Sequence, residues 1–223
     1  HAGARAFGWV PRVADAQRAA FEQLAQQAGL TNVAITERDT QGSVVPATVR
    51  AVYYPIMLVT SLSNCIAAVG CDLGADAQQR ATLEQACDSG EIVATRSRLL
   101  RCLNSQRQRV VLVAPVYRPA ALLETVAQRR AALRGFVLSV FHPDDLLLER
   151  LRDLPIRGLH TVLDDVTETT SGEELCHVYG RLTQLQQNIT RAAVFHGAPC
   201  FARTFRFATR DWRITEIASS EYC

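Results

Sequence analysis

The stretch from residue 54 to residue 117 most constrains the fold, because its apolar runs are short and separated by polar or glycine-containing segments. Two runs, Tyr53–Val59 and Cys65–Cys71, come first, and a helical pattern ending at Gly90 follows. Two further runs, Ile92–Thr95 and Val110–Val116, complete the stretch. Runs of this length are typical of strands. The order strand, strand, helix, strand, strand predicts a small α/β module, and no segment of it resembles a catalytic motif.

Two helices have recognisable ends. Asp76 is a suitable N-cap for a helix over Gln78–Cys87, which Gly90 would terminate. Nearer the N-terminus, Pro11 can occupy a first helical turn, and apolar residues then recur at helical spacing until Gly29. This second pattern predicts an amphipathic helix, which residue spacing alone does not distinguish from an ordinary surface helix.

The same order of elements restarts in the second half. A helix is predicted over Ala120–Arg134, a strand over Gly135–Phe141, a helix opened by Pro143 and Asp144, and a strand over Gly158–Asp164. Three more strands are predicted, over Glu174–Tyr179, Cys200–Ala208 and Trp212–Ala218. The polar segment Arg101–Arg109 is expected to be an exposed hairpin turn. We therefore place a joint between two halves at Arg134 and Gly135.

Charge and hydropathy exclude several classes of protein. The chain has 24 basic and 22 acidic residues, a formal net charge of +2, and every basic residue is arginine. Such a balance provides no basic surface for nucleic acid, which is not an expected partner. No run reaches the roughly 18 to 20 apolar residues of a membrane span. A cytosolic protein and a receptor ectodomain without its flanking spans would both look like this.

Cysteine and histidine patterns give no metal site. The seven cysteines include no Cys-x-x-Cys pair, and the five histidines form no metal-binding motif. Cys176 and Cys200 are the best candidates for a disulfide, because both fall on predicted strands of the same half. The paired carboxylates Asp144–Asp145 and Asp164–Asp165 have a form that can bind a cation or act in acid/base chemistry. Adjacent residues on a strand point to opposite faces, however, and next to Pro143 a helix cap explains Asp144 more simply. No cofactor is expected, and the chain is not predicted to be an enzyme.

Asp72 is the polar group in the most unfavourable place. It ends a largely apolar run and precedes Leu73, so its carboxylate should lie at the edge of a core, where an unpaired charge is costly. One interpretation pairs it with Arg80 or with backbone amides, or makes it a helix cap. The other makes it a ligand-facing carboxylate.

The order and spacing of several short motifs resemble the CHASE sensory domains, which are ligand-binding modules outside the membrane in bacterial and plant receptors, including cytokinin receptors. Beyond the central stretch, the resemblance is carried by Trp9–Val13, Ala34–Arg38, Gly135–Val137 and Arg210–Trp212. The motifs are individually short, but their order extends over most of the chain. This sequence departs from the family pattern in having Thr60 and Ser61 before Asn64, and Cys71 before the aspartate.

The resemblance implies a mixed α/β (α+β) fold: a long N-terminal helix followed by two tandem PAS-like subdomains with mostly antiparallel sheets. The corresponding domains are an N-terminal stalk helix over 1–31, a membrane-distal ligand-binding half over 32–119, a connecting helix over 120–134 and a membrane-proximal half over 135–223. An aspartate of the central motif contacts the ligand in cytokinin-binding members. Carried over, the ligand-binding residues are Asp72, Ala94 and Thr95, with Leu99 and Tyr54 as walls.

The resemblance also implies a function. The chain would be the periplasmic or extracellular sensor of a membrane-tethered receptor, a homodimer through its N-terminal helix, that binds a small-molecule ligand. A conformational change would then reach a cytoplasmic histidine kinase or diguanylate cyclase. The departures near the aspartate leave the ligand's chemistry open. The alternative is a dimerisation or protein-interaction ectodomain without a ligand.

Overall fold

The computed structural model describes residues 4–27, 34–60, 69–96, 110–151, 159–168, 173–179, 182–183 and 199–218. The chain forms two compact units, and each is described by itself. The first unit comprises Arg5–Gln106 and Val111–Val140. The second unit comprises Phe141–Cys223 with the short segments His1–Ala4 and Arg107–Val110.

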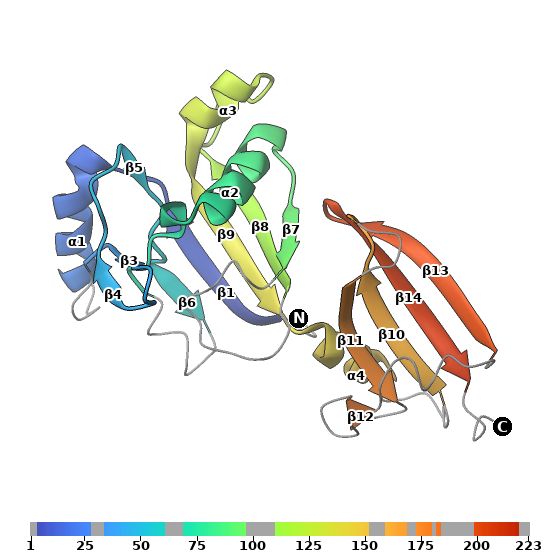
Figure 1. The fold of residues 1–223 in the computed structure, drawn as a ribbon. Coiled ribbons are helices and arrows are strands. Elements are labelled where there is room, and N and C mark those ends of the chain that lie inside the picture. The colour runs from blue at the N-terminus through green and yellow to red at the C-terminus, as the bar shows by residue number, and fades with distance from the viewer. Residues whose placement is uncertain are drawn as a thin grey trace. The chain divides into compact units, whose positions relative to one another are not determined.

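A five-stranded sheet forms the centre of the first unit. Its order is β6 (Leu58–Thr60), β1 (Ala4–Pro11), β9 (Leu133–Phe141), β8 (Val110–Tyr117) and β7 (Val93–Arg96). β1 and β6 are antiparallel, with Phe7 opposite Thr60. The helix α2 (Ala77–Ser89) covers one face of the sheet (Figure 1). Leu83 and Ala86 of α2 are buried in one core with Val111 and Phe136 of the sheet.

The ends of α2 follow the sequence closely. Asp76 is its N-cap, and its side chain accepts hydrogen bonds from the backbone N–H groups of Gln78 and Gln79. Gly90 ends the helix in the left-handed conformation, with a φ of 76°, which a residue without a Cβ adopts without strain. The predictions of this helix and its two ends are therefore confirmed.

Smaller elements lie beside the sheet in the first unit. β2 (Val13–Ala14) pairs with β5 (Val52–Tyr53), and β3 (Thr36–Arg38) pairs with β4 (Val44–Pro46) in a hairpin. Between β2 and β3 are a 3-10 turn, η1 (Asp15–Gln17), and the helix α1 (Arg18–Gln27). A second 3-10 turn, η3 (Leu73–Ala75), precedes α2. The helix α3 (Val126–Ala132) connects β8 to β9.

The second unit contains an antiparallel five-stranded sheet. Its order is β12 (Leu182–Thr183), β11 (Glu173–Tyr179), β10 (Leu159–Asp165), β14 (Arg210–Ala218) and β13 (Cys200–Phe207). The helix α4 (Pro143–Leu151) contacts β11. Val162 and Ile217 are fully buried on the central strands β10 and β14.

The structure corrects the predicted N-terminal helix. Residues 4–11 are not helical but form β1, a strand between β6 and β9, and α1 begins only at Arg18. Pro11 ends the strand instead of opening a helix. Strand pairing on both sides of β1 satisfies the backbone groups of residues 4–11, and the helical spacing of apolar residues, which starts only after Pro11, forms a helix from Arg18 on.

The predicted joint between the halves is also wrong. Residues 120–125 are not helical, and α3 begins after its N-cap Thr125 and passes directly into β9. β9 then lies beside β8 in the sheet of the first unit, so the division falls after Val140 and not at Arg134. The predicted turn over Arg101–Arg109 lies outside the described residues.

The predicted disulfide between Cys176 and Cys200 is wrong as well, because Cys200 is an exposed free thiol. Cys176 is on β11 and Cys200 on β13, and two strands, β10 and β14, lie between them. Strands about 4.8 Å apart place these positions at least roughly 14 Å from each other, whereas bridged cysteines need Cα atoms within about 7 Å. Cys71 is disulfide-bonded.

Candidate functional site

The site is built around the extended backbone that leads into η3. Asp72 N–H donates to the carbonyl of Thr36 at 2.7 Å, and Leu73 N–H donates to the carbonyl of Tyr54 at 3.0 Å. An isolated bridge also joins Cys71 to Thr36. The segment before α2 is thus held between β3 and the chain after β5, which fixes Asp72 next to the β3–β4 hairpin.

The carboxylate of Asp72 is buried and bonded at both oxygens. Oδ1 accepts the backbone N–H groups of Tyr54 at 2.7 Å and Gly74 at 2.9 Å. Oδ2 accepts Nη1 of Arg50 at 2.5 Å, an ion pair in which the Asp72 side chain is 0 % exposed and that of Arg50 23 %. Backbone amides and one guanidinium thus offset the loss of hydration.

The expected pairing of Asp72 with Arg80 is not formed. Arg80 donates instead to the carbonyl of Gly74 at 3.1 Å and lies 4.0 Å from Glu84. The other structural interpretation, bonding to backbone amides and capping of a helical turn, is confirmed, since Asp72 is the N-cap of η3. The cation that completes its coordination is Arg50, 22 residues earlier in the chain.

Arg50 connects the buried aspartate to the hairpin. Its Nη2 donates to Glu37 Oε2 at 2.6 Å and to Thr48 Oγ1 at 2.7 Å. Burial by itself raises the pKa of Glu37, but hydrogen bonds from Arg50 and Thr48 outweigh burial and hold that pKa below its ordinary value. Glu37, Arg50 and Asp72 therefore form one charged triad, which joins β3 to the start of η3.

A pocket of about 280 Å³ opens between this triad, the hairpin and the start of α2. Its wall is mainly polar and comes from segments far apart in the sequence. The residues that line it are Glu37, Arg38, Asp39, Thr40, Gly42, Arg50, Cys71, Asp72, Ala75, Asp76 and Gln79. A volume just below the usual range for drug-sized ligands suits a small polar molecule.

Gln79, in the first turn of α2, is the most informative residue of the wall. The residue is only 5 % exposed. Its backbone N–H donates to Asp76 Oδ1 at 3.0 Å, but within the described part of the chain its carboxamide has no hydrogen-bond partner. Buried amides normally have one. A buried amide that lines a pocket and lacks a partner is a group prepared for a ligand.

The carboxamide of Gln79 is not fully sealed from solvent. Among the described residues, the one side-chain polar atom that is fully sealed from solvent without a hydrogen bond is Oγ1 of Thr161, in the second unit. The amide of Gln79 is therefore not sealed inside the core. The residue lines the pocket, so a molecule bound there would lie next to it.

The other predicted site residues do not gather around this pocket. Tyr54 contributes its backbone N–H to Asp72, and its ring packs edge-on against Phe136, with centroids 5.6 Å apart. Ala94 is buried and Thr95 half-buried on β7, and neither lines the pocket. Leu99 lies outside the described residues. A ligand role for Tyr54, Ala94, Thr95 and Leu99 stays a prediction.

Sequence reasoning missed most of the pocket wall. Arg50 and Gln79 carry no signal that distinguishes them in the sequence. Asp76 was recognised, but as a helix cap. The polar, glycine-containing segment 39–43 is typical of a turn, but nothing in the sequence shows that this turn lies next to α2.

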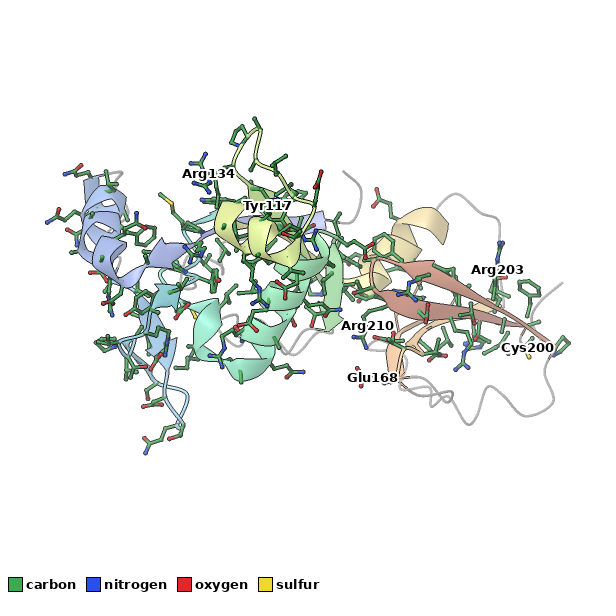
Figure 2. The ribbon with its side chains drawn as sticks, turned by 90° about the horizontal axis from the view of Figure 1, so that it is seen from above. Tyr117, Arg134, Glu168, Cys200, Arg203 and Arg210 are labelled. Carbon is green, nitrogen blue, oxygen red and sulfur yellow. The ribbon has the colours of Figure 1, made fainter. Side chains whose placement is uncertain are left out.

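The second unit contains two buried ion pairs that are structural. Asp164 pairs with Arg213 at 2.9 Å, and Asp165 pairs with Arg210 at 2.5 Å. Arg210 also lies 3.3 Å from Glu168, and both are marked in Figure 2. Burial opposes ionisation of Asp165, but its hydrogen bonds to Arg210 and Thr167 outweigh burial and lower its pKa. Each aspartate is thus bound across the β10–β14 pair.

Two further observations apply to the described residues alone. They contain no group of three or more histidine, cysteine, aspartate or glutamate side chains that could hold a metal ion. They also include no helix that is long and apolar enough to cross a membrane.

A mixed α/β unit with a small polar pocket is an arrangement suited to a sensory domain. The chain belongs to the CHASE domain family, whose model matches residues 1–176. CHASE domains are extracytoplasmic sensory modules, so the chain has a sensory role outside the cytoplasm.

Similarity to individual known proteins is low. No curated protein matches the chain. Among solved structures, the ligand-binding domain of the Pseudomonas aeruginosa PAO1 amino acid chemoreceptor PctC, in complex with GABA, is similar at a TM-score of 0.36 and 13 % identity. The similarity covers 90 % of this chain and 80 % of that chain.

Proposed function

We propose that this chain is the ligand-binding sensor domain of a transmembrane receptor, and that the ligand is a small molecule bound in the pocket of the first unit. The observation that carries this proposal is Gln79, a buried carboxamide that lines the pocket and has no partner in the described part of the chain. A ligand would supply the missing hydrogen bonds.

In this proposal Asp72 has a supporting role. Its two oxygens are already bonded, so it fixes Arg50 and η3 in place and forms part of the wall. Ala94, Thr95 and Tyr54 would then belong to the surrounding unit instead of contacting the ligand.

A route for the signal leads from the pocket to α1. Arg18 of α1 donates to the carbonyls of Ile35 at 3.1 Å and Ala47 at 3.0 Å, the residues on either side of the hairpin. Glu22 accepts the N–H of Ile35 at 2.9 Å. A ligand that moves the hairpin towards α2 would therefore also shift α1. We propose that this shift is passed on to a cytoplasmic histidine kinase or diguanylate cyclase in a homodimeric, membrane-tethered parent protein.

The test is a substitution that fills the pocket. Gln79→Trp should leave the fold intact but abolish binding of any molecule that co-purifies with the chain or raises its melting temperature in a screen of metabolites. Gln85→Trp, on an exposed position of the same helix, is the matched control and should bind normally. Ligands whose binding is unaffected by Gln79→Trp would place the site elsewhere, and the pocket proposal would fail.

The alternative, a protein-interaction or dimerisation ectodomain, is favoured by a different observation. Phe201, Phe205 and Phe207 are exposed on β13, the edge strand of the second unit, and exposed apolar edges often pair with other chains. This alternative predicts concentration-dependent self-association in sedimentation experiments and no melting-temperature response to any small molecule.

A further inference from the structure

The charges that line the pocket indicate which ligands it can bind. Four carboxylates, those of Glu37, Asp39, Asp72 and Asp76, face two guanidinium groups, those of Arg38 and Arg50. The wall therefore has a formal charge of −2 from these six side chains. A pocket of this sign favours cations over anions.

The arginines offer little to an anion. Arg50 is held between Glu37 and Asp72 at 2.6 and 2.5 Å, so the triad as a whole is negative. Arg38 is exposed and donates through Nη1 to the carbonyl of Gly42. An anion would have to approach these groups past the uncompensated carboxylates of the same wall.

Two aspartates keep open acceptor positions. Asp39 uses Oδ1 for the N–H groups of Gln41 and Ser43. Asp76 likewise uses Oδ1 for those of Gln78 and Gln79. Within the described residues, the second oxygen of each carboxylate accepts no hydrogen bond. Ionised oxygens in this state are strong acceptors for N–H groups of a cation.

The start of α2 does not reverse this preference. A helix N-terminus carries about half a positive charge, which by itself would favour an anion. Asp76 caps that N-terminus with a full negative charge and two hydrogen bonds. The wall thus remains negative after the helix dipole is included.

We propose that the pocket binds a small organic cation through an ammonium or guanidinium group, with the open oxygens of Asp39 and Asp76 and the carboxamide of Gln79 as its partners. This proposal rests on the proposed function. Its support is the combination of net charge, open carboxylate oxygens and the buried unpartnered amide. A bare metal ion is a poorer fit, because the described residues contain no group of three metal-ligating side chains.

Three probes with the same number of carbon atoms test the charge preference: butylammonium, butyramide and butyrate, titrated into isotopically labelled protein and followed by NMR. Butylammonium should bind at least tenfold tighter than either other probe, about 1.4 kcal/mol or more. Its affinity should fall when the ionic strength rises from roughly 0.05 to 0.5 M. Butyrate or butyramide binding as tightly as butylammonium, or no binding of butylammonium at any soluble concentration, would overturn the proposal.

Charge-deleting variants locate the effect. Asp76→Asn keeps an N-cap acceptor and Asp39→Asn keeps Oδ1, so both should fold, and each should weaken butylammonium binding at least fivefold. Glu84→Gln removes one negative charge from an exposed position of α2 outside the pocket wall and should change that affinity less than twofold. If Glu84→Gln weakened binding as much as the two aspartate variants, the effect would be one of overall charge, and the assigned partners would be wrong.

The cation inference and the proposed function can fail separately. A neutral or anionic molecule whose binding is lost in Gln79→Trp would overturn the inference and leave the sensor pocket in place. If every molecule that binds the wild-type chain also bound Gln79→Trp, both the cation inference and the proposed function would be overturned.

Discussion

The substitution Asp72→Asn separates a structural role of this residue from a ligand-binding one. The asparagine carbonyl can still accept the backbone N–H groups of Tyr54 and Gly74. Its NH₂ group, however, replaces the oxygen that lies 2.5 Å from Nη1 of Arg50. Two donors then face each other, and the buried ion pair is lost. We expect the fold to be retained but clearly destabilised.

The size of the effect follows from the surroundings of Arg50. Removing one partner of a fully buried ion pair is destabilising by about 3 to 5 kcal/mol. Here the Arg50 side chain is 23 % exposed and keeps Glu37 at 2.6 Å, so the expected loss is smaller, about 2 kcal/mol. For a chain of this length, such a loss lowers the melting temperature by about 4 to 8 °C.

Urea denaturation of a double-mutant cycle measures the interaction itself. Asp72→Asn, Arg50→Met and the double variant should show a coupling free energy of about 1 kcal/mol or more. Asp88→Asn is a matched control, because Asp88 pairs with Arg130 at 2.6 Å but both side chains are partly exposed. It should be destabilising by no more than about 1 kcal/mol.

One pattern of results would refute this reasoning. If Asp72→Asn melted like the wild type and lost only ligand affinity, the carboxylate would be a ligand contact and its bonds to Arg50 and the backbone would be of little energetic importance. Additive effects of the two single substitutions would also contradict a strong Asp72–Arg50 pair.

Three further predictions concern the core, pH and thiols. Gly135→Ala should lower the free energy of unfolding by about 3 kcal/mol in urea titrations, because a Cβ there would lie 2.3 Å from a backbone oxygen of β1. Gly42→Ala should lower it by less, because a Cβ at Gly42 would have no atom within 4 Å. Equal losses in the two variants would contradict this prediction. Burial lowers the pKa of His160, so the unfolded chain binds more protons than the folded chain near and below about pH 6.5. The free energy of unfolding should therefore decrease as the pH is lowered through this range, by at most about 1.4 kcal/mol per pH unit. His160→Gln should reduce this slope, and an unchanged slope would exclude His160 as its source. Iodoacetamide should modify the exposed Cys200 in the native chain, but the buried Cys87 only after unfolding. Burial is also the main cause of the raised pKa of the Cys87 thiol. If peptide mass spectrometry found both cysteines modified at equal rates, the burial of Cys87 would be disproved.

Local signals in the sequence predicted the elements whose ends are set by local chemistry. Asp76 and Gly90 fix α2 because an N-cap and a left-handed C-terminal glycine act within a few residues of themselves. The strand β8 was equally predictable from its run of apolar β-branched residues.

Elements set by distant pairing were not predictable in this way. Residues 4–11 form β1 because β6 and β9 pair with them from both sides, and neither partner is close in the sequence. The joint between the halves was misplaced for the same reason. The predicted order of elements restarts at Gly135, but the strand that contains this residue, β9, belongs to the sheet of the first unit. The order of elements alone therefore does not define a unit.

The candidate site shows which kind of polar group identifies function. Asp72 was found from sequence because a charge at the end of an apolar run must have a partner, and it has three. Asp164 and Asp165 are also buried and paired with arginines, without lining the pocket of the first unit. Burial of a charge therefore indicates a bonded group and does not separate structure from function.

Gln79 is uncharged and inconspicuous in the sequence, but it is buried without a partner for its carboxamide in the described part of the chain. A group whose hydrogen bonds are left open at a pocket is the stronger indication of a ligand, because side-chain amides in nearly buried positions normally have a protein partner.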